Sequence, residues 1–249
     1  MLLSGKVALV TGGGNGMGRA YCVALAREGA SVVVTDLDAD SAKSVAVEIE
    51  QAGGVALGVR CDVSNQAEVD DAVATATDTF GGVDILINNA ALHLTKWTGP
   101  FASFSTDQLR TLFDVNIMGL VAMTLACRPV MTERGGGVVV NIGSTSGYLS
   151  TSPYGVTKLA VRGLTVAFAK ELGSSNIRVN GIAPGIIYTD SALAQLGEDG
   201  LAEHRRGQAT DIRGEVSDVV ETMLFLVSDK ARMITGEMVK VAAGLVLVP

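Results

Sequence analysis

The stretch KVALVTGGGNGMGRAYCVALAREG, residues 6–29, decides the fold. Its apolar start, Lys6–Thr11, predicts a buried strand, and Gly16–Glu28 predicts a helix that ends at Gly29. A glycine-rich turn joins the two elements. Glycine lets the backbone turn sharply and come close to an anion, and a helix N-terminus offers free N–H groups. The stretch therefore predicts a phosphate-binding turn between a strand and a helix.

Strands and helices alternate along the rest of the chain. Six further apolar runs predict strands: Ser31–Asp36, Val55–Cys61, Val83–Ile87, Gly137–Ile142, Ile177–Ile182 and Met238–Val241. Five further segments predict helices: Ala39–Gln51, Gln66–Phe80, Thr106–Met131, Pro153–Leu172 and Val216–Ser228. Continuously apolar strands are typical of a parallel sheet covered on both faces. We expect one α/β domain over residues 1–249, a Rossmann-like, doubly wound sheet of seven parallel strands.

The region 184–214 differs from the rest, because polar residues and glycines interrupt it. We expect it to be irregular. Within it, residues of about 190–214 are expected to form a substrate loop that acts as a flexible lid.

Composition excludes several classes of protein. The 249 residues carry a net charge of −7, and an acidic surface argues against nucleic-acid binding, which needs Lys and Arg at the phosphates. We find no apolar run long enough for a bilayer and no signal-peptide pattern, so we expect a cytoplasmic protein without a membrane partner. Three scattered cysteines and two histidines indicate neither a disulfide framework nor a metal site.

A second motif, Tyr154-Gly155-Val156-Thr157-Lys158, carries candidate chemistry. Residues four apart on a helix share one face, so the Lys158 ammonium is expected near the Tyr154 hydroxyl. A free tyrosine has a pKa of about 10, too high for a good base at neutral pH. A cation about 4 Å away favours the phenolate by roughly 1–4 kcal/mol, which lowers the pKa by roughly one to three units. Tyr154 is therefore the candidate general acid and base.

Together, the T-G-x-x-x-G-x-G pattern from Thr11 and the Y-x-x-x-K pattern from Tyr154 resemble the short-chain dehydrogenase/reductase family. The resemblance extends over essentially the whole chain. It implies a nicotinamide dinucleotide cofactor and hydride exchange with an alcohol or ketone. The cofactor-binding residues that it implies are Gly12, Asn15, Gly16, Met17, Gly18, Asp36, Leu37, Asp62, Val63, Asn89, Ala90, Ala91, Tyr154, Lys158, Pro184, Gly185, Ile187 and Thr189.

Asp36, at the end of the second predicted strand, bears on the choice of cofactor. A carboxylate there accepts hydrogen bonds from the adenosine ribose and repels a 2′-phosphate. Members of the family that use NADP tend to carry Lys or Arg at positions that are Gly13, Gly14, Asn15 and Leu37 here. We therefore expect NAD. The alternative is that Asp36 only caps the loop before the next helix.

Ser144 and Asn116 complete the catalytic set that the resemblance implies. Relatives place twelve residues between the serine and the tyrosine, whereas this chain has nine between Ser144 and Tyr154. Counting back by the usual spacing reaches Asn141, inside the predicted strand. We choose Ser144, at the strand end, to hold the substrate oxygen, with Ser146 as a weaker candidate. The side chain of Asn116 is expected to bind a water that links Lys158 to solvent.

Some features depart from the family pattern. Its N-N-A-G ends in Ala91 here, and its C-terminal V-D-G-G reads Val241-Ala242-Ala243-Gly244. His93, Trp97 and Phe101 follow the fourth predicted strand and are candidates for lining the substrate pocket. We expect a homotetramer or homodimer that pairs the helices Thr106–Met131 and Pro153–Leu172, as relatives do.

These features predict an NAD(H)-dependent oxidoreductase that interconverts a small-molecule secondary alcohol and ketone. One alternative is an NADPH-dependent 3-oxoacyl-thioester reductase, which the Asp36 carboxylate disfavours. The other is a non-catalytic protein that senses dinucleotides or serves as a scaffold. The set of Asn116, Ser144, Tyr154 and Lys158 disfavours it, because binding alone needs no proton path.

Overall fold

The computed structural model describes residues 1–92 and 96–247. Over these residues a seven-stranded sheet runs in the order β3-β2-β1-β4-β5-β6-β7, and every neighbouring pair is parallel. The strands are β1 (Val7–Thr11), β2 (Ser31–Asp36), β3 (Val55–Arg60), β4 (Ile85–Asn88), β5 (Gly137–Ile142), β6 (Ile177–Pro184) and β7 (Met238–Val241). The predicted Rossmann-like, doubly wound fold is confirmed.

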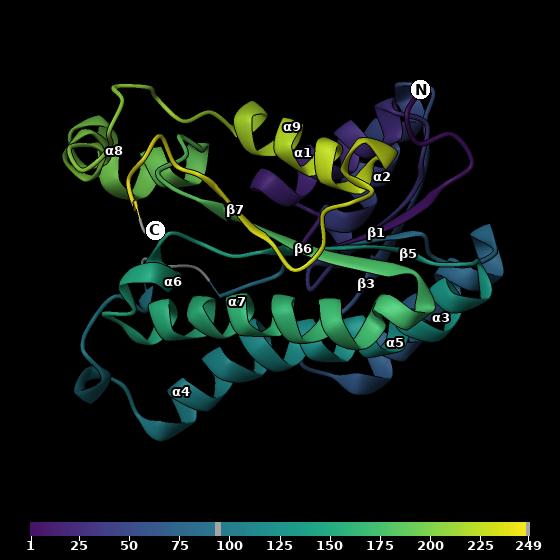
Figure 1. Ribbon diagram of the computed structural model, residues 1–249, viewed down its shortest axis with the longest axis horizontal. Helices are drawn as coiled ribbons and strands as arrows, with labels where there is room; N and C mark the ends of the chain where they lie inside the picture. Colours follow the sequence, from purple (N-terminus) through teal and green to yellow (C-terminus); the bar gives the residue numbers. More distant parts are fainter. Residues whose placement is uncertain (93–95, 248–249) are drawn as a thin grey trace.

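Helices cover both faces of this sheet (Figure 1). One face carries α1 (Gly16–Arg27), α2 (Ala39–Gln51) and α9 (Val216–Val227). The other carries α3 (Gln66–Phe80), α4 (Thr106–Phe113), α5 (Gly119–Glu133) and α7 (Pro153–Leu172). Successive strand residues point to opposite faces, so Ala8 and Val10 join one core while Leu9 joins the other. Burial on both faces is the reason that the strands read as continuous apolar runs.

The sheet places all its functional loops at one edge. The strand order reverses between β1 and β4, which leaves a crevice at the carboxyl ends of these two strands. The loops after β1, β2, β3, β4, β5 and β6 all emerge at this edge, because parallel strands end on the same side. Asn116, Tyr154 and Lys158 lie on helices. Every other cofactor and catalytic residue expected from the sequence lies at the end of a strand, in one of these loops or at the start of the helix that follows.

The expected irregularity of region 184–214 is wrong over half its length. A helix, α8 (Asp190–Arg205), occupies it, and the Thr189 hydroxyl caps its start by accepting a hydrogen bond from the Ala192 N–H at 3.1 Å. Gly197 interrupts the helical dihedral angles inside α8, with φ 67° and ψ 173°. The glycine that suggested irregular structure therefore makes a kink between two helical segments. The expected flexibility of this lid stays a prediction.

The long helix predicted over Thr106–Met131 is interrupted in the structure. A π-helical turn, Asp114–Met118, separates α4 from α5. A π-helical turn inserts one residue into the helix and is often found at functional sites. Its central residue is Asn116.

The expectation that no segment could span a bilayer also needs correction. By length and composition alone, Thr106–Glu133 is long and apolar enough. In the fold this segment covers the sheet, and Met123, Cys127 and Met131 are buried in the core beside α3 and β5. Its apolar side chains are divided between this core and the surface, where Met118 and Leu125 are 53% and 44% exposed.

Candidate active site

The glycine-rich loop after β1 is tied to the loop after β4 across the crevice. The Asn89 side-chain amide donates to the carbonyl oxygens of Thr11 at 3.0 Å and Gly12 at 2.9 Å. In return, the Thr11 hydroxyl accepts hydrogen bonds from the backbone N–H groups of Asn89 and Ala90, both at 3.0 Å. These bonds fix the position of the loop before any ligand binds.

The start of α1 fits the pyrophosphate of a dinucleotide. Gly12 has φ +62°, and a Cβ there would lie 3.0 Å from the Ala90 Cα, so the loop tolerates only glycine at this point. Asn15, the N-cap of α1, makes no side-chain cap hydrogen bond, whereas Asp38 caps α2 and Asn65 caps α3. The first turn of α1, with Gly16, Met17 and Gly18, therefore keeps N–H groups available for an anion.

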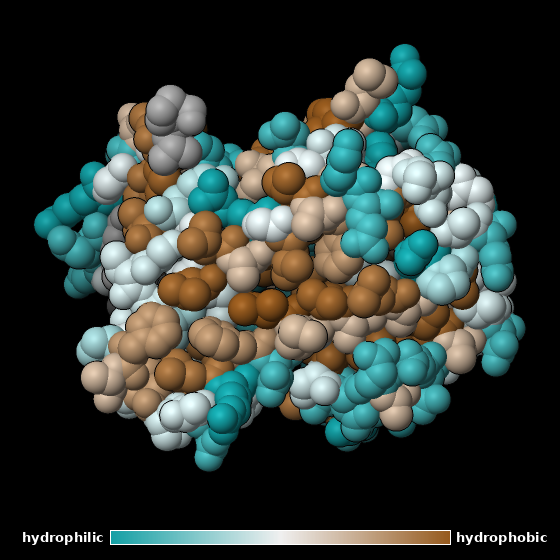
Figure 2. Space-filling view, turned by 60° about the horizontal axis from the view of Figure 1, so that its bottom comes forward, coloured by the Kyte–Doolittle hydropathy of each residue, from teal (hydrophilic) through white to brown (hydrophobic). Residues whose placement is uncertain are grey.

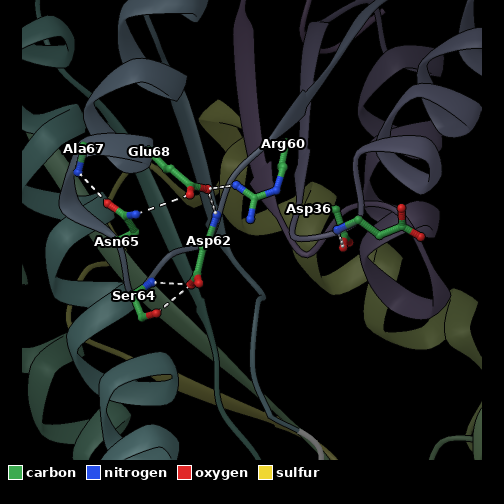
Figure 3. Close-up of polar contacts among 8 residues, drawn as sticks. Asp36, Arg60, Asp62, Ser64, Asn65, Ala67 and Glu68 are labelled. Carbon is green, nitrogen blue, oxygen red and sulfur yellow. Dashed lines mark hydrogen bonds and ion pairs between the residues drawn. The ribbon is translucent and has the colours of Figure 1, made fainter.

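Asp36 lies at the end of β2, beside this loop (Figure 3). One carboxylate oxygen accepts a hydrogen bond from the Gly14 N–H at 2.9 Å, and the other from the Asp38 N–H at 3.1 Å. Asp36 thus caps the loop, as the alternative interpretation of this residue held. The carboxylate still places negative charge next to the cofactor loop. Leu37, the next residue, leaves 61% of its surface exposed at this edge.

A polar cluster follows β3 at the same edge. Figure 3 shows Arg60 between Asp36 and Asp62, with its guanidinium on the Glu68 carboxylate at 2.5 Å. Glu68 also accepts the Asp62 N–H at 2.8 Å, and Asp62 accepts two hydrogen bonds from Ser64. The hydrogen bond with Arg60 lowers the pKa of Glu68. The two hydrogen bonds from Ser64 hold the Asp62 carboxylate in one orientation. Sequence reasoning missed Arg60 and Glu68, although a charged residue at a strand end was a signal for the first.

Tyr154 and Lys158 lie in the first turns of α7. The Ser152 hydroxyl caps this helix by accepting the Gly155 N–H at 3.1 Å, and Pro153 occupies its first position. Both functional side chains are buried, and the Lys158 Nζ lies 5.7 Å from the centre of the Tyr154 ring. The Lys158 ammonium donates to the carbonyl of Ile142, at the end of β5, at 2.8 Å.

The short loop after β5 brings Ser144 close to Tyr154, and the Ser144 side chain acts to lower the pKa of Tyr154. A one-turn helix, α6 (Ser146–Leu149), fills the loop, and its first N–H donates to the Ser144 hydroxyl oxygen at 3.1 Å. Asn141 is fully buried and its side chain bonds to Asn88 and Thr165. The structure thus brings Ser144 together with Tyr154, and it does not bring Asn141 there.

The expected lowering of the Tyr154 pKa is wrong for the resting protein. Burial raises the pKa of Tyr154 to about 12, although the nearby Ser144 hydroxyl acts in the opposite direction. Burial also lowers the pKa of Lys158 to about 8. Both side chains lose water on folding, and loss of water disfavours the charged form of each. At neutral pH, therefore, Tyr154 holds its proton.

Asn116 is placed close to the site, and its side chain is already engaged. Its amide oxygen accepts the Leu92 N–H at 2.7 Å, and its amide nitrogen donates to the Thr157 hydroxyl at 3.2 Å and to the Leu92 carbonyl at 3.4 Å. These bonds tie the loop after β4 to α7, next to Lys158. The Asn116 side chain thus holds two segments together, and the water that it is expected to bind stays a prediction.

The loop after β6 forms another wall of the site. Pro184 ends β6, and Gly185 donates its N–H to the Val241 carbonyl at 2.9 Å. Ile187 is buried beside Gly214, and Thr189 begins α8.

Of the proposed pocket residues, His93 lies outside the described part of the chain. Trp97 stacks on Phe104 at 5.2 Å, and its carbonyl accepts the Tyr154 N–H at 3.5 Å. Phe101 leaves 44% of its surface exposed. Trp97 is thus the aromatic residue that contacts the catalytic segment.

Comparisons with known proteins agree with this geometry. A family model described as enoyl-(acyl carrier protein) reductase matches residues 12–246. An uncharacterized oxidoreductase of Mycobacterium tuberculosis is 39% identical over 246 residues, which cover 99% of each chain. The 7α-hydroxysteroid dehydrogenase of Escherichia coli K12 is 36% identical over 97% of this chain and 94% of its own.

A solved structure points the same way. It is that of a 7α-hydroxysteroid dehydrogenase with NADH and 7-oxo glycochenodeoxycholic acid. It superposes with a TM-score of 0.90 at 33% identity, covering 97% of this chain and 94% of that chain.

Proposed function

Because this chain belongs to the short-chain dehydrogenase/reductase family, we propose that it interconverts a secondary alcohol and a ketone with NAD(H). One observation carries the proposal. The hydroxyls of Tyr154 and Ser144 lie close to each other, with the Lys158 ammonium one helical turn away and the anion-binding loop of α1 at the same sheet edge. Two hydroxyls that converge in this way can hold one substrate oxygen between them.

We propose NAD(H) because the protein carries a negative charge where the adenosine of the cofactor would bind. Bound there, the cofactor supplies the nicotinamide that exchanges a hydride with the substrate carbon. The Asp36 carboxylate, held against the Gly14 N–H, disfavours the extra phosphate of NADP. Asp62, oriented by Ser64, keeps one carboxylate oxygen available for the adenine amine.

The three side chains divide the proton chemistry. Tyr154 holds a proton at neutral pH, so it can donate this proton to the oxygen of a ketone as the hydride arrives. Ser144 orients that oxygen and stabilises the charge that develops on it. Lys158, when charged, favours the phenolate that remains and the reverse reaction. Asn116 holds the loop after β4 against α7, which keeps Lys158 in position.

A second candidate is reduction of a 3-oxoacyl thioester with NADPH. The matching family model is described as enoyl-(acyl carrier protein) reductase, and this description supports the acyl-thioester class of substrate but not the 3-oxo group. The Asp36 carboxylate opposes it, because thioester reductases of this size usually prefer NADPH and a carboxylate repels the 2′-phosphate. Cofactor preference therefore separates the two candidates.

The test follows turnover with each cofactor on purified protein. A panel of secondary alcohols and ketones, with 7-oxo bile acids and a 3-oxoacyl thioester among them, is assayed with NAD(H) and NADP(H). We expect turnover of alcohols or ketones with NAD(H) and little with NADP(H). NADPH-dependent turnover of the thioester would replace the first candidate by the second.

Tyr154→Phe tests the mechanism itself. We expect turnover to fall by about 10²–10⁴-fold, because proton transfer by a positioned side chain contributes about that much, while NADH binding is unchanged. Tyr148→Phe is the matched control, because the Tyr148 ring lies against Arg162 and Lys240. Undiminished turnover in Tyr154→Phe would contradict the mechanism. Binding of NADH without turnover in the native protein would favour a sensing or scaffold role.

We further propose a homodimer or homotetramer located in the cytoplasm. Apolar side chains form a band across the face that carries α5 and α7 (Figure 2). Met118 and Leu125 are 53% and 44% exposed, and Leu159 and Val166 are 44% and 59% exposed. Each pair is seven residues apart, so each forms a stripe on one side of its helix. Pairing of these helices between subunits would remove both stripes from water.

A further inference from the structure

Four polar side chains form a chain of hydrogen bonds inside the core. The Asn88 amide nitrogen donates to the Thr124 hydroxyl at 3.0 Å and to the Asn141 amide oxygen at 2.9 Å. The Asn141 nitrogen then donates to the Thr165 hydroxyl at 3.0 Å. All four residues are at most 5% exposed. We call this set, Thr124, Asn88, Asn141 and Thr165, the core polar chain.

The two threonines at the ends of the core polar chain determine which group donates and which accepts in each of its hydrogen bonds. The Thr124 hydroxyl donates to the Leu120 carbonyl and the Thr165 hydroxyl to the Val161 carbonyl, both at 2.8 Å. Each hydroxyl has one hydrogen, so each must accept from the asparagine beside it. The amide oxygen of Asn141 therefore faces Asn88, and Asn88 must donate a hydrogen bond to it from its amide nitrogen. The amide oxygen of Asn88 is forced to the other side.

That oxygen has no partner. The Asn88 Oδ1 is one of two buried side-chain nitrogen or oxygen atoms that lack a hydrogen bond in the described part of the chain. Asn88 lines a small cavity whose other polar wall residues are Thr11, Asn116 and Lys158. An unpaired buried amide oxygen is costly, and a polar cavity of this kind takes up water when it offers two or more partners. The free space is about that of one water molecule.

We propose that this cavity holds one buried water that donates a hydrogen bond to Asn88 Oδ1 and accepts one from Lys158 Nζ. Asn88 is then a positioning residue for Lys158. The ammonium of Lys158 has three hydrogens, and one of them is bound to the Ile142 carbonyl. The water occupies a second, which leaves the third for the cofactor in the proposed function. Only the assignment of this third hydrogen to the cofactor rests on the proposed function.

The water has a definite effect on Lys158, because its lone pair faces the ammonium. The titratable group that faces Lys158 is Tyr154, on α7, which is neutral at neutral pH. The strands and the π-helical turn present uncharged groups to the cavity: Asn88 from β4, Ile142 from β5 and Asn116. A hydrogen bond to the charged form therefore stabilises the ammonium without competition from another charge in this wall.

Substitutions at Asn88 test the proposal through the charge state of Lys158. Lys158 is followed by its ¹³Cε NMR shift against pH in protein without cofactor, with the signal assigned by its loss in Lys158→Met. Asn88→Leu removes the oxygen, and we expect the midpoint to fall by about one pH unit. Asn88→Asp places a carboxylate at the water, and we expect the midpoint to rise. Opposite shifts cannot come from loosened packing alone.

Thr124→Val is the matched control. It breaks the core polar chain at the nitrogen side of Asn88 and leaves the oxygen side unchanged. We expect it to lower stability and to leave the Lys158 midpoint where it is. Equal shifts in Thr124→Val and Asn88→Leu would overturn the proposal and leave Asn88 a structural role only.

A crystal structure of the native protein decides the matter even where a variant fails to fold. We expect density for one water within hydrogen-bond distance of Asn88 Oδ1 and Lys158 Nζ. A dry cavity at high resolution would overturn the proposal. Neither readout needs substrate, so failure here is distinct from failure of the proposed activity, which the Tyr154→Phe assay reports.

Discussion

Among single residues, Lys158 combines a catalytic position with a cost in stability. It is 4% exposed, and burial lowers its pKa to about 8. An unfolded lysine has a pKa of about 10.4. Between pH 8 and pH 10 the unfolded chain therefore binds more protons than the folded one, and stability should rise with pH. Below pH 8 the full cost applies, about 3 kcal/mol at 1.36 kcal/mol per unit.

Lys158→Met should remove this cost. We expect the free energy of unfolding at pH 7 to rise by about 1–3 kcal/mol and its increase between pH 8 and pH 10 to flatten. Urea unfolding at a series of pH values measures both. The series stops near pH 10, because the raised pKa of Tyr154 lowers stability at higher pH.

The control for this substitution is Lys170→Met, which makes the same change at an exposed position of α7. It should leave stability within about 0.5 kcal/mol of the native protein. A destabilised Lys158→Met would show that the hydrogen bond to Ile142 outweighs the loss of water.

At the scale of elements, the kink inside α8 depends on one glycine, Gly197. Gly197 has φ 67° and ψ 173°, a region that is essentially restricted to glycine, and a Cβ there would meet open space. Gly197→Ala therefore introduces backbone strain of about 1–3 kcal/mol and no clash. Because α8 lies at the edge of the domain, it can relieve the strain by opening locally. We expect proteolysis within α8 to accelerate several-fold and KM to change, with a small change in Tm.

Gly163→Ala is the matched control at this scale. Gly163 lies inside α7, its φ is not positive, and a Cβ there also meets open space. Alanine is favoured over glycine in a helix by about 1 kcal/mol, so this variant should be more stable and keep its KM. Equal behaviour of the two variants would mean that the kink at Gly197 has no function.

For the whole molecule, the exposed stripes of α5 and α7 predict the quaternary structure. Val166 is 59% exposed in the single chain, and Val166→Lys replaces it with a charged side chain. If α7 lies in a subunit interface, the charge must be buried there, and the assembly should dissociate by at least one step. Light scattering after size exclusion measures the mass. Val47→Lys, at a position of α2 that is 48% exposed, on the opposite face of the sheet, should not change the mass.

Much of the site could be predicted because it is encoded locally. The glycine-rich turn, the strand ends and the helical spacing of Tyr154 and Lys158 are short-range features, and each has a physical reason in its own segment. The choice of Ser144 over Asn141 also rested on a local feature, the end of β5. The kink of α8 and the π-helical turn at Asn116 were not predicted, because glycine and asparagine are compatible with several local structures.

The sequence by itself determined the order of the elements, the parallel sheet and the edge at which the functional loops meet, because hydrophobic periodicity and strand connection leave few alternatives. Only the tertiary structure decided what these side chains experience. The pKa of Tyr154 is raised and not lowered because burial outweighs its neighbours. The Asn116 amide is engaged by Leu92 and Thr157, and the unpaired oxygen belongs to Asn88. Desolvation and hydrogen-bond direction depend on residues from several strands and helices, which no local pattern specifies.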